Sequence, residues 1–316
     1  MFRRFLYGIR SLIPSQTSGT PLGVGQPPGK KIPPRESWDR SNITPHGSHQ
    51  HPPLGSALCR QRDFDTPWFR EWVRRFATPM RYHRGLWEWI YVSEALRERG
   101  VLSSQSRGLG FGVGAEPLPA AYASLGCRIT ATDLPLDEAS KKGWAGGVQY
   151  AGRKEGLKNN QICPEEQFSR LVDFRHCDMS DIPSDLDEFD FCWSCCALEH
   201  LGSLDAGIRF VERSLDTLRP GGWAVHTTEF NMSSNAATIE SGPTVLYREC
   251  DLMRLIENLQ NDGNQIANLD LTPGDQILDG FVDLPPYELW EPHLKLAIEG
   301  YTCTSVAIIV QKDTKI

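Results

Sequence analysis

The sequence predicts an α/β fold of the doubly wound kind, in which a mostly parallel sheet carries helices on both faces. Strand-like and helix-like segments alternate between residues 106 and 229, and such alternation implies a parallel sheet. A glycine-rich turn, Gly108-Leu-Gly-Phe-Gly-Val-Gly-Ala-Glu116, separates the first strand from its helix. A β-branched, apolar segment at 300–310 predicts one more strand near the end of the chain.

The individual elements follow from hydrophobic spacing and from helix-breaking residues. Strands are expected at residues 106–111, 128–132, 172–177, 189–194, 222–229 and 300–310, and helices at 68–76, 83–99, 116–125, 137–144 and 204–218. In the last of these helices Ser203 is a suitable N-cap, and Arg219-Pro-Gly-Gly ends the helix. A strand fragment at 244–247 and a helix at 254–259 are expected after the alternating part.

The expected organisation is one catalytic domain with additions, at residues 65–316. It comprises N-terminal helices at 65–104, a core at 105–230 with an insertion at 145–171, a lid or substrate-recognition region at 231–299, and the final strand at 300–316. Residues 1–64 are expected to form a disordered basic tail, because much of this stretch is rich in Pro, Gly, Ser and His. The basic, apolar residues 2–13 either make weak contact with a membrane surface or are simply part of this tail.

The charge distribution argues against nucleic acid as a partner. The chain has a net charge of −7, yet residues 1–62 hold nine Lys and Arg against two Asp and Glu. The remainder is therefore strongly acidic, whereas binding to phosphate requires clustered positive charge. The body of the protein is expected to act on a small molecule, and its oligomeric state does not follow from the sequence.

The cysteines favour a reducing compartment, and we expect the protein in the cytoplasm. There are nine of them, an odd number without a regular framework. Cys192, Cys195 and Cys196 lie in a segment that resembles a buried strand, and no second pair with zinc-ligand spacing accompanies them. They are interpreted as small core residues, and no metal is expected.

The glycine turn and the acid that follows the second strand point to a cofactor that contains adenosine. Gly110, Gly112 and Gly114 leave no side chains where the backbone must turn tightly and approach a ligand. Asp133 ends the second strand, where a carboxylate can accept hydrogen bonds from both ribose hydroxyls. The spacing of Gly110, Gly112 and Ala115 also fits a nicotinamide dinucleotide, so the turn alone does not identify the cofactor.

Four further segments resemble the class I S-adenosylmethionine-dependent methyltransferases, in order and spacing, over roughly residues 105–230. They are Cys177-Asp-Met-Ser-Asp-Ile-Pro183, Phe189-Asp-Phe-Cys-Trp-Ser194, Leu198-Glu-His-Leu201 and Leu218-Arg-Pro-Gly-Gly-Trp-Ala-Val225. The resemblance implies a Rossmann-like, doubly wound, mostly parallel sheet of seven strands with an antiparallel C-terminal strand. It implies S-adenosylmethionine (SAM) as the cofactor.

The same resemblance assigns cofactor-binding residues. The turn at Gly110, Gly112 and Gly114 would surround the methionine part of SAM, Asp133 would hold the ribose, and Asp178 with Met179 would meet the adenine. Leu134 and Cys195 are expected beside the cofactor as well. One position departs from the family pattern: many members carry an acid where Gly108 stands. Glu116 is either a substitute partner for the ammonium group of the cofactor or a helix-start acid favoured by the helix dipole.

Catalytic candidates follow the fourth strand. His200 is the first choice for a general base, since its ordinary pKa near 6.5 suits proton removal at neutral pH. Glu199 accompanies it, and the alternative is that both residues only shape the turn. Some relatives of the quinone pathway complete a magnesium site with a Glu three residues before this pair. Cys196 stands there instead, which argues against a metal.

Substrate-binding candidates come from the fifth strand and from the second N-terminal helix. Glu229 and Asn231 lie where the strand ends, where they could bind a polyol or an amine, or Glu229 could satisfy backbone donors of the loop. Trp89 either lines the site or packs in the core. The favoured function is methyl transfer to a small molecule or sugar, with oxygen as the preferred acceptor atom. A non-catalytic SAM-binding module and, less favoured, a nicotinamide-dependent dehydrogenase are the alternatives.

Overall fold

The computed structural model of the chain describes residues 53–141, 150, 152–287 and 291–315. The predicted membrane-contact segment, residues 2–13, and most of the predicted tail lie outside these ranges. Within them, no helix combines the length and the apolar character that a membrane crossing requires. All nine cysteines fall in the described part and are free thiols.

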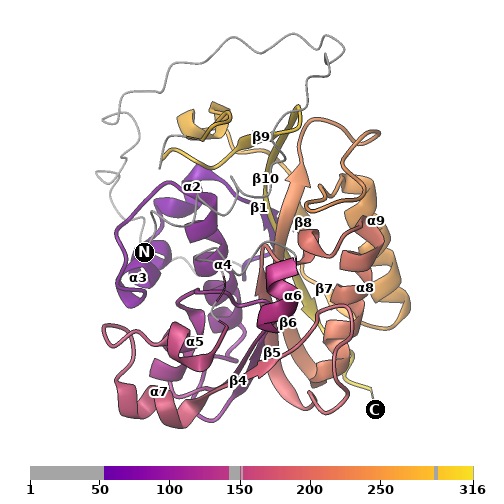
Figure 1. Cartoon of the computed structure of the whole chain (residues 1–316). Helices are drawn as coiled ribbons and strands as arrows, with labels where there is room; N and C mark the ends of the chain where they lie inside the picture. The colour runs from indigo at the N-terminus through magenta and orange to yellow at the C-terminus, as the bar shows by residue number, and fades with distance from the viewer. Residues whose placement is uncertain (1–52, 142–149, 151, 288–290, 316) are drawn as a thin grey trace.

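A single twisted sheet forms the centre of the molecule, as the sequence predicts (Figure 1). Its strands are β1 (Ser56–Leu58), β2 (Arg107–Gly110), β3 (Arg128–Asp133), β4 (Val172–His176), β5 (Phe189–Cys195), β6 (Leu218–Asn231), β7 (Gln265–Ile266), β8 (Leu269–Asp270), β9 (Leu296–Ile298) and β10 (Tyr301–Gln311). The order is β4-β3-β2-β5-β6-β10-β1-β8. Strands β2 to β6 pair in parallel, and β10 runs antiparallel to β6.

Helices cover both faces of the sheet, and the alternation of side chains along each strand builds two separate apolar cores. On one face lie α3 (Pro67–Arg75), α4 (Arg84–Glu98), α5 (Leu118–Ser124) and α7 (Glu165–Leu171), and on the other α8 (Leu204–Ser214) and α9 (Glu249–Asn261) (Figure 1). Along β6, Val225 belongs to the first core and its neighbour Ala224 to the second. This is the period of two expected of a strand buried on both faces.

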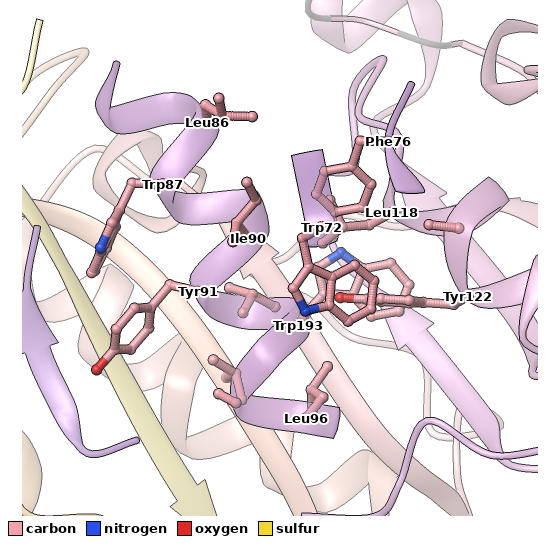
Figure 2. Packing of buried hydrophobic residues seen from close by; sticks show 14 of the residues in the cluster. Trp72, Phe76, Leu86, Trp87, Ile90, Tyr91, Leu96, Leu118, Tyr122 and Trp193 are labelled. Atoms are coloured by element: carbon pink, nitrogen blue, oxygen red, sulfur yellow. The ribbon is translucent and has the colours of Figure 1, made fainter. Parts of the chain in front are cut away.

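Helix α4 carries two buried aromatic residues, Trp87 and Tyr91, on the same side of the helix (Figure 2). Trp87 stacks on Tyr91 with ring centroids 4.4 Å apart. The indole of Trp87 donates a hydrogen bond of 2.7 Å to Asp63 of the preceding helix, α2 (Gln61–Phe64). Across the core, Tyr122 of α5 meets the ring of Trp193 edge-on, with centroids 5.1 Å apart. These contacts join α4 to α2, and α5 to β5.

Two sequence-based expectations are wrong at the far edge of the sheet. The predicted tail, residues 1–64, is too long, because β1 and α2 lie within it and Ala57 pairs with Ala307 of β10. The sheet contains ten strands in the described residues rather than seven, because β1, β7, β8 and β9 fill the edge beyond β10. These short strands have no hydrophobic period of their own, so only their pairing defines them: β1, β7 and β9 pair with β10, and β8 pairs with β1.

The region 231–299 therefore belongs partly to the sheet and is not simply a lid. Its strands β7 and β9 pair with β10, and β8 pairs with β1. Its long helix is α9, which extends the predicted helix 254–259 in both directions. The strand fragment predicted at 244–247 is absent: Tyr247 makes only an isolated bridge to Phe230.

Gly108 occupies a position in β2 with no room for a side chain. A Cβ atom there would lie 2.3 Å from Cζ of Phe191, which belongs to the adjacent strand. We expect Gly108→Ala to lower the free energy of unfolding by about 1–3 kcal/mol, because overpacking displaces the ring. Urea unfolding measures this change. Gly280→Ala is the matched control, since a Cβ at Gly280 meets nothing within 4 Å; equal stabilities of the two variants would contradict the prediction.

Candidate functional site

The glycine turn leaves β2 between the carboxyl ends of the neighbouring strands. The N–H of Phe111 donates to Trp193 O of β5 at 2.9 Å, and the N–H of Val113 donates to Thr132 O of β3 at 3.0 Å. Gly112 and Gly114 have φ of 57° and 49°, in the left-handed region that glycine adopts without steric cost. The turn is thus held from both sides at the edge where open α/β sheets bind ligands.

Gly112 packs closely against residues that follow two other strands. A Cβ atom at this position would lie 3.1 Å from Cβ of Ala197 and 3.2 Å from Sδ of Met179. Ala197 follows β5, and Met179 follows β4. The turn therefore meets the ends of two other strands at Gly112, where any larger side chain would displace Ala197 or Met179.

Asp133 ends β3 with a buried carboxylate directed at the turn. Its Oδ2 accepts from the N–H of Gly114 at 3.2 Å, and its Oδ1 accepts from the N–H of Leu134 at 2.9 Å. Leu134 is buried, and its carbonyl accepts from the hydroxyl of Tyr150 at 2.8 Å. The carboxylate is thus held beside the glycine turn, as expected of a group that receives ribose hydroxyls.

Asp178 and Met179 form a tight turn after β4. Oδ1 of Asp178 accepts from the N–H of Ser180 at 2.8 Å, and O of Asp178 accepts from the N–H of Asp181 at 3.0 Å. Met179 is buried and faces Gly112. The structure thus brings these two residues to the same edge as Gly112 and Asp133.

Glu116 lies beneath the turn and is almost fully buried. Its Oε1 accepts a 2.6 Å hydrogen bond from the indole N–H of Trp193. Burial raises the pKa of Glu116 to about 8, and hydrogen bonds from Trp193 and Cys195 offset this only in part. Because Glu116 is buried at the turn, it fits the role of partner for the cofactor's ammonium group better than the role of an exposed helix-start acid. Gly108 cannot be replaced by such an acid, because the ring of Phe191 leaves no room for a side chain there.

Glu199 and His200 lie in a short 3-10 helix, η4 (Leu198–His200), directly after β5. Glu199 is buried, and its Oε2 accepts from the hydroxyl of Thr228 at 3.1 Å. Nδ1 of His200 lies 2.8 Å from Pro243 O. Because a carbonyl oxygen only accepts, Nδ1 carries the hydrogen and Nε2 the lone pair of the neutral ring.

A buried ion pair joins α4 to β6. Nη2 of Arg84 contacts Oε1 of Glu229, and Nη1 of Arg84 lies 3.1 Å from Oε1 of Glu88. Ser305 of β10, which pairs with Glu229, accepts from Nη1 of Arg84 at 3.1 Å and donates to Glu88. The thiol of Cys196 donates to the same oxygen of Glu88 at 3.0 Å. We call Arg84, Glu88, Cys196, Glu199 and Glu229 the charged cluster.

The charged cluster includes a set of donor atoms that could hold a metal ion. Cys196, Glu199 and Glu229 each offer one donor atom, and these atoms lie within 4.8 Å of one another. The sequence predicts no metal here, and that expectation stays a prediction. A guanidinium already lies in the same cluster: Nη1 of Arg84 is 3.5 Å from Sγ of Cys196.

Asn231 and Trp89 make their contacts outside the charged cluster. The side chain of Asn231 binds within its own loop: Nδ2 donates to Ala237 O at 3.0 Å, and Oδ1 accepts from the N–H of Ser233 at 2.8 Å. It thus has the loop-ordering role that the sequence left open for Glu229. Trp89 is half-buried and packs against the larger apolar core. The substrate roles of both residues stay predictions.

Sequence reasoning missed Arg84 and Glu88. They are spaced four residues apart on one helix, which is a common pattern on solvated helix faces. What distinguishes them is their position among Leu86, Trp87 and Ile90, because charged residues inside an apolar helix face are buried with partners. No local signal identifies Glu229 as the partner of Arg84, since the two residues are 145 positions apart in the sequence.

The acids of the site make stability depend on pH. Burial raises the pKa of Glu116 to about 8 and those of Glu199 and Glu229 to about 7, all above the value of 4.5 for an exposed Glu. Between these values the folded state therefore holds more protons on these groups than the unfolded state does. Their contribution to the free energy of unfolding is full below about pH 4.5 and falls as the pH rises to about 8.

We expect Glu116→Gln, which cannot ionise, to flatten the fall in Tm between pH 7 and 8.5. Differential scanning calorimetry across this range measures the slope. Glu240→Gln is the control, because Glu240 is exposed and pairs with Arg248 at the surface. A slope that Glu116→Gln leaves unchanged would show that this carboxyl does not titrate there.

The residues at this edge fit SAM. The glycine turn brings backbone without side chains to this edge, a buried carboxylate lies beside it, and Met179 borders it. Gly110, Gly112, Gly114, Asp133, Asp178 and Met179 would hold the cofactor, with Glu116 beneath its methionine end. When bound, SAM supplies an electrophilic methyl group on a sulfonium.

Comparisons with known proteins agree with this geometry. Residues 108–226 match the family model described as "Methyltransferase domain". No curated protein matches the sequence. Similar solved structures include the (4+2)-cyclase SpnF, with 16% identity, a TM-score of 0.46, and coverage of 83% of this chain and 98% of that one.

Two further structures are a candidate sarcosine dimethylglycine methyltransferase from Galdieria sulphuraria and a magnesium protoporphyrin IX methyltransferase from Synechocystis PCC 6803. The first has 16% identity, a TM-score of 0.44, and coverage of 72% of this chain and 84% of that one. The second has 11% identity, a TM-score of 0.42, and coverage of 80% and 98%. Residues 108–226 thus match a methyltransferase domain, in the part of the chain where the sequence resembles the class I S-adenosylmethionine-dependent methyltransferases.

Proposed function

We propose that the protein transfers the methyl group of SAM to a small polar molecule bound at the carboxyl ends of β5 and β6. One observation carries this proposal: Cys196, Glu199 and His200 follow directly on β5, whose end borders the glycine turn, and Glu229 lies near the end of the adjacent strand β6. In-line displacement requires little more than an acceptor atom held about 3–3.5 Å from the methyl carbon. A polar side-chain cluster next to the turn suits that task.

The acceptor classes that fit are hydroxyl oxygen, of a small molecule or sugar, and amine nitrogen. Carboxylates accept hydrogen bonds from both. His200 is the proposed general base, since its Nδ1–H contact with Pro243 directs the basic lone pair to Nε2. Glu199, next to it, would orient the acceptor. The acidic body supports an acceptor without phosphate groups.

A second candidate function is a SAM-binding module without catalysis, which the replacement of the family's acid by Gly108 favours. Release of S-adenosylhomocysteine separates the two candidates. A protein that releases this product with any member of a panel of sugars, phenols and amines is an enzyme. A protein that binds SAM and releases none is a module.

Gly112→Asp tests the cofactor site itself. We expect the parent to bind SAM in isothermal titration calorimetry and the variant to bind about 100-fold more weakly or not at all, because the new side chain would displace Ala197 or Met179. Gly280→Asp is the control, at an exposed glycine with open space around it. Failure of the parent chain to bind SAM would end the proposal.

His200→Gln tests the general base. On the best acceptor of the panel, we expect the methylation rate at pH 7 to fall about 100-fold with unchanged affinity for S-adenosylhomocysteine, because only proton removal is lost. A rate that stays within a factor of two, with the same dependence on pH as the parent, would leave His200 with a structural role only.

A further inference from the structure

The charged cluster holds more negative than positive groups in a buried environment. Glu88, Glu199 and Glu229 have exposed fractions of 2%, 1% and 3%, and Arg84 is their cation. One guanidinium against three carboxyl groups leaves two negative charges without a partner if all ionise. Buried charge of this kind is stable only when it is neutralised by protons or by a bound cation.

One oxygen of the cluster has no hydrogen-bond partner in the described residues. It is the buried Oε2 of Glu229, whereas Oε1 of the same carboxylate contacts Arg84. Buried polar atoms in folded proteins nearly always have partners, so an orphaned carboxylate oxygen points to a ligand. The groups that face it are Arg84, Glu88, Glu199, His200, Tyr287 and Cys303.

The spacing of the acceptor atoms suits an ammonium group. Glu199 and Glu229 each offer a carboxylate oxygen, and the two oxygens lie within 4.8 Å of each other. Two oxygens that each accept a hydrogen bond of about 2.8 Å from one tetrahedral nitrogen lie roughly 4.6 Å apart. Zinc with bonds of about 2.1 Å would draw the same atoms to roughly 3.4 Å and would compete with the guanidinium of Arg84.

We propose that the charged cluster binds the protonated amine of the methyl acceptor, so that the enzyme is an N-methyltransferase for small amines. This inference rests on the proposed function and names its substrate class. Glu199 and Glu229 hold the ammonium group, and His200, the general base of the proposed function, takes one proton from it. The nitrogen lone pair that this exposes forms the new N–C bond, and the methyl–sulfur bond breaks with its electron pair on sulfur, which gives S-adenosylhomocysteine and a methylated ammonium product. The proton on His200 then passes to water.

Proton balance supports the same site. Burial raises the pKa of Glu199 and of Glu229 to about 7. The empty cluster therefore keeps protons near neutral pH, and an arriving cation displaces them. Binding of an amine would release protons to the buffer, whereas binding of a neutral alcohol would not.

The test uses the full chain saturated with S-adenosylhomocysteine and methylammonium chloride as the probe. At pH 7.5 we expect methylammonium to raise Tm more than sodium chloride of equal ionic strength, with heats of binding that change with the ionisation enthalpy of the buffer. We expect Glu199→Gln and Glu229→Gln to weaken the apparent affinity about tenfold or more, since each removes a charge-assisted hydrogen bond. Glu229→Gln removes the charge that pairs with Arg84. If this variant does not fold, Glu199→Gln is the informative one.

Glu240→Gln is the matched control, and it should bind methylammonium like the parent because Glu240 lies in a surface pair with Arg248. Two results would overturn the inference: methylammonium no more effective than sodium, or stabilisation by micromolar zinc or magnesium chloride without an effect of methylammonium. Titration of S-adenosylhomocysteine into the same samples distinguishes failure of the amine assignment from failure of the proposed function. Intact cofactor binding with no response to methylammonium removes only the amine assignment.

Discussion

The buried guanidinium of Arg84 is the interaction on which the arrangement of this molecule depends. It joins the first turn of α4 to Glu229 of β6 and to Ser305 of β10, two strands that pair directly with each other. An intact buried ion pair adds little net stability, but removal of one partner leaves a buried charge that costs about 3–5 kcal/mol. Arg84 therefore determines where the N-terminus of α4 meets the sheet. The aromatic residues of α4 and the carboxylate of Glu88 are positioned with it.

One strand end connects the cofactor side of the site to the charged cluster. The indole of Trp193 in β5 holds Glu116 under the glycine turn, and three residues later the thiol of Cys196 bonds Glu88. Cys196 has φ of 43°, a left-handed value that redirects the chain as β5 ends. Its N–H donates to the hydroxyl of Thr227 at 3.1 Å, which compensates for the strained backbone. Trp193 and Cys196 thus link the two sides of the site through one strand end.

The sequence predicted what depends on local pattern and missed what depends on pairing across the fold. Strands such as Arg128–Asp133 and the helix that follows Ser203 were predictable because their periods and caps lie within the element. The edge strand Ser56–Leu58 was not, because only its pairing with β10 makes it a strand. In the site, the glycine turn and Asp133 follow from spacing. Arg84 did not, since its partner Glu229 is distant in sequence.

The charged cluster lowers the free energy of unfolding, which indicates that it has a function other than stability. Apolar side chains of similar volume usually replace buried charges with a gain in stability, so a cluster of three carboxyl groups around one guanidinium reduces the stability of the folded chain. Ser305 and Thr228 satisfy some of its oxygens, yet Oε2 of Glu229 stays without a partner in the described residues. Proteins tolerate such local violations chiefly at functional sites. A bound group that satisfies this oxygen would recover the lost free energy, and that recovered free energy is available for holding an acceptor against the methyl donor.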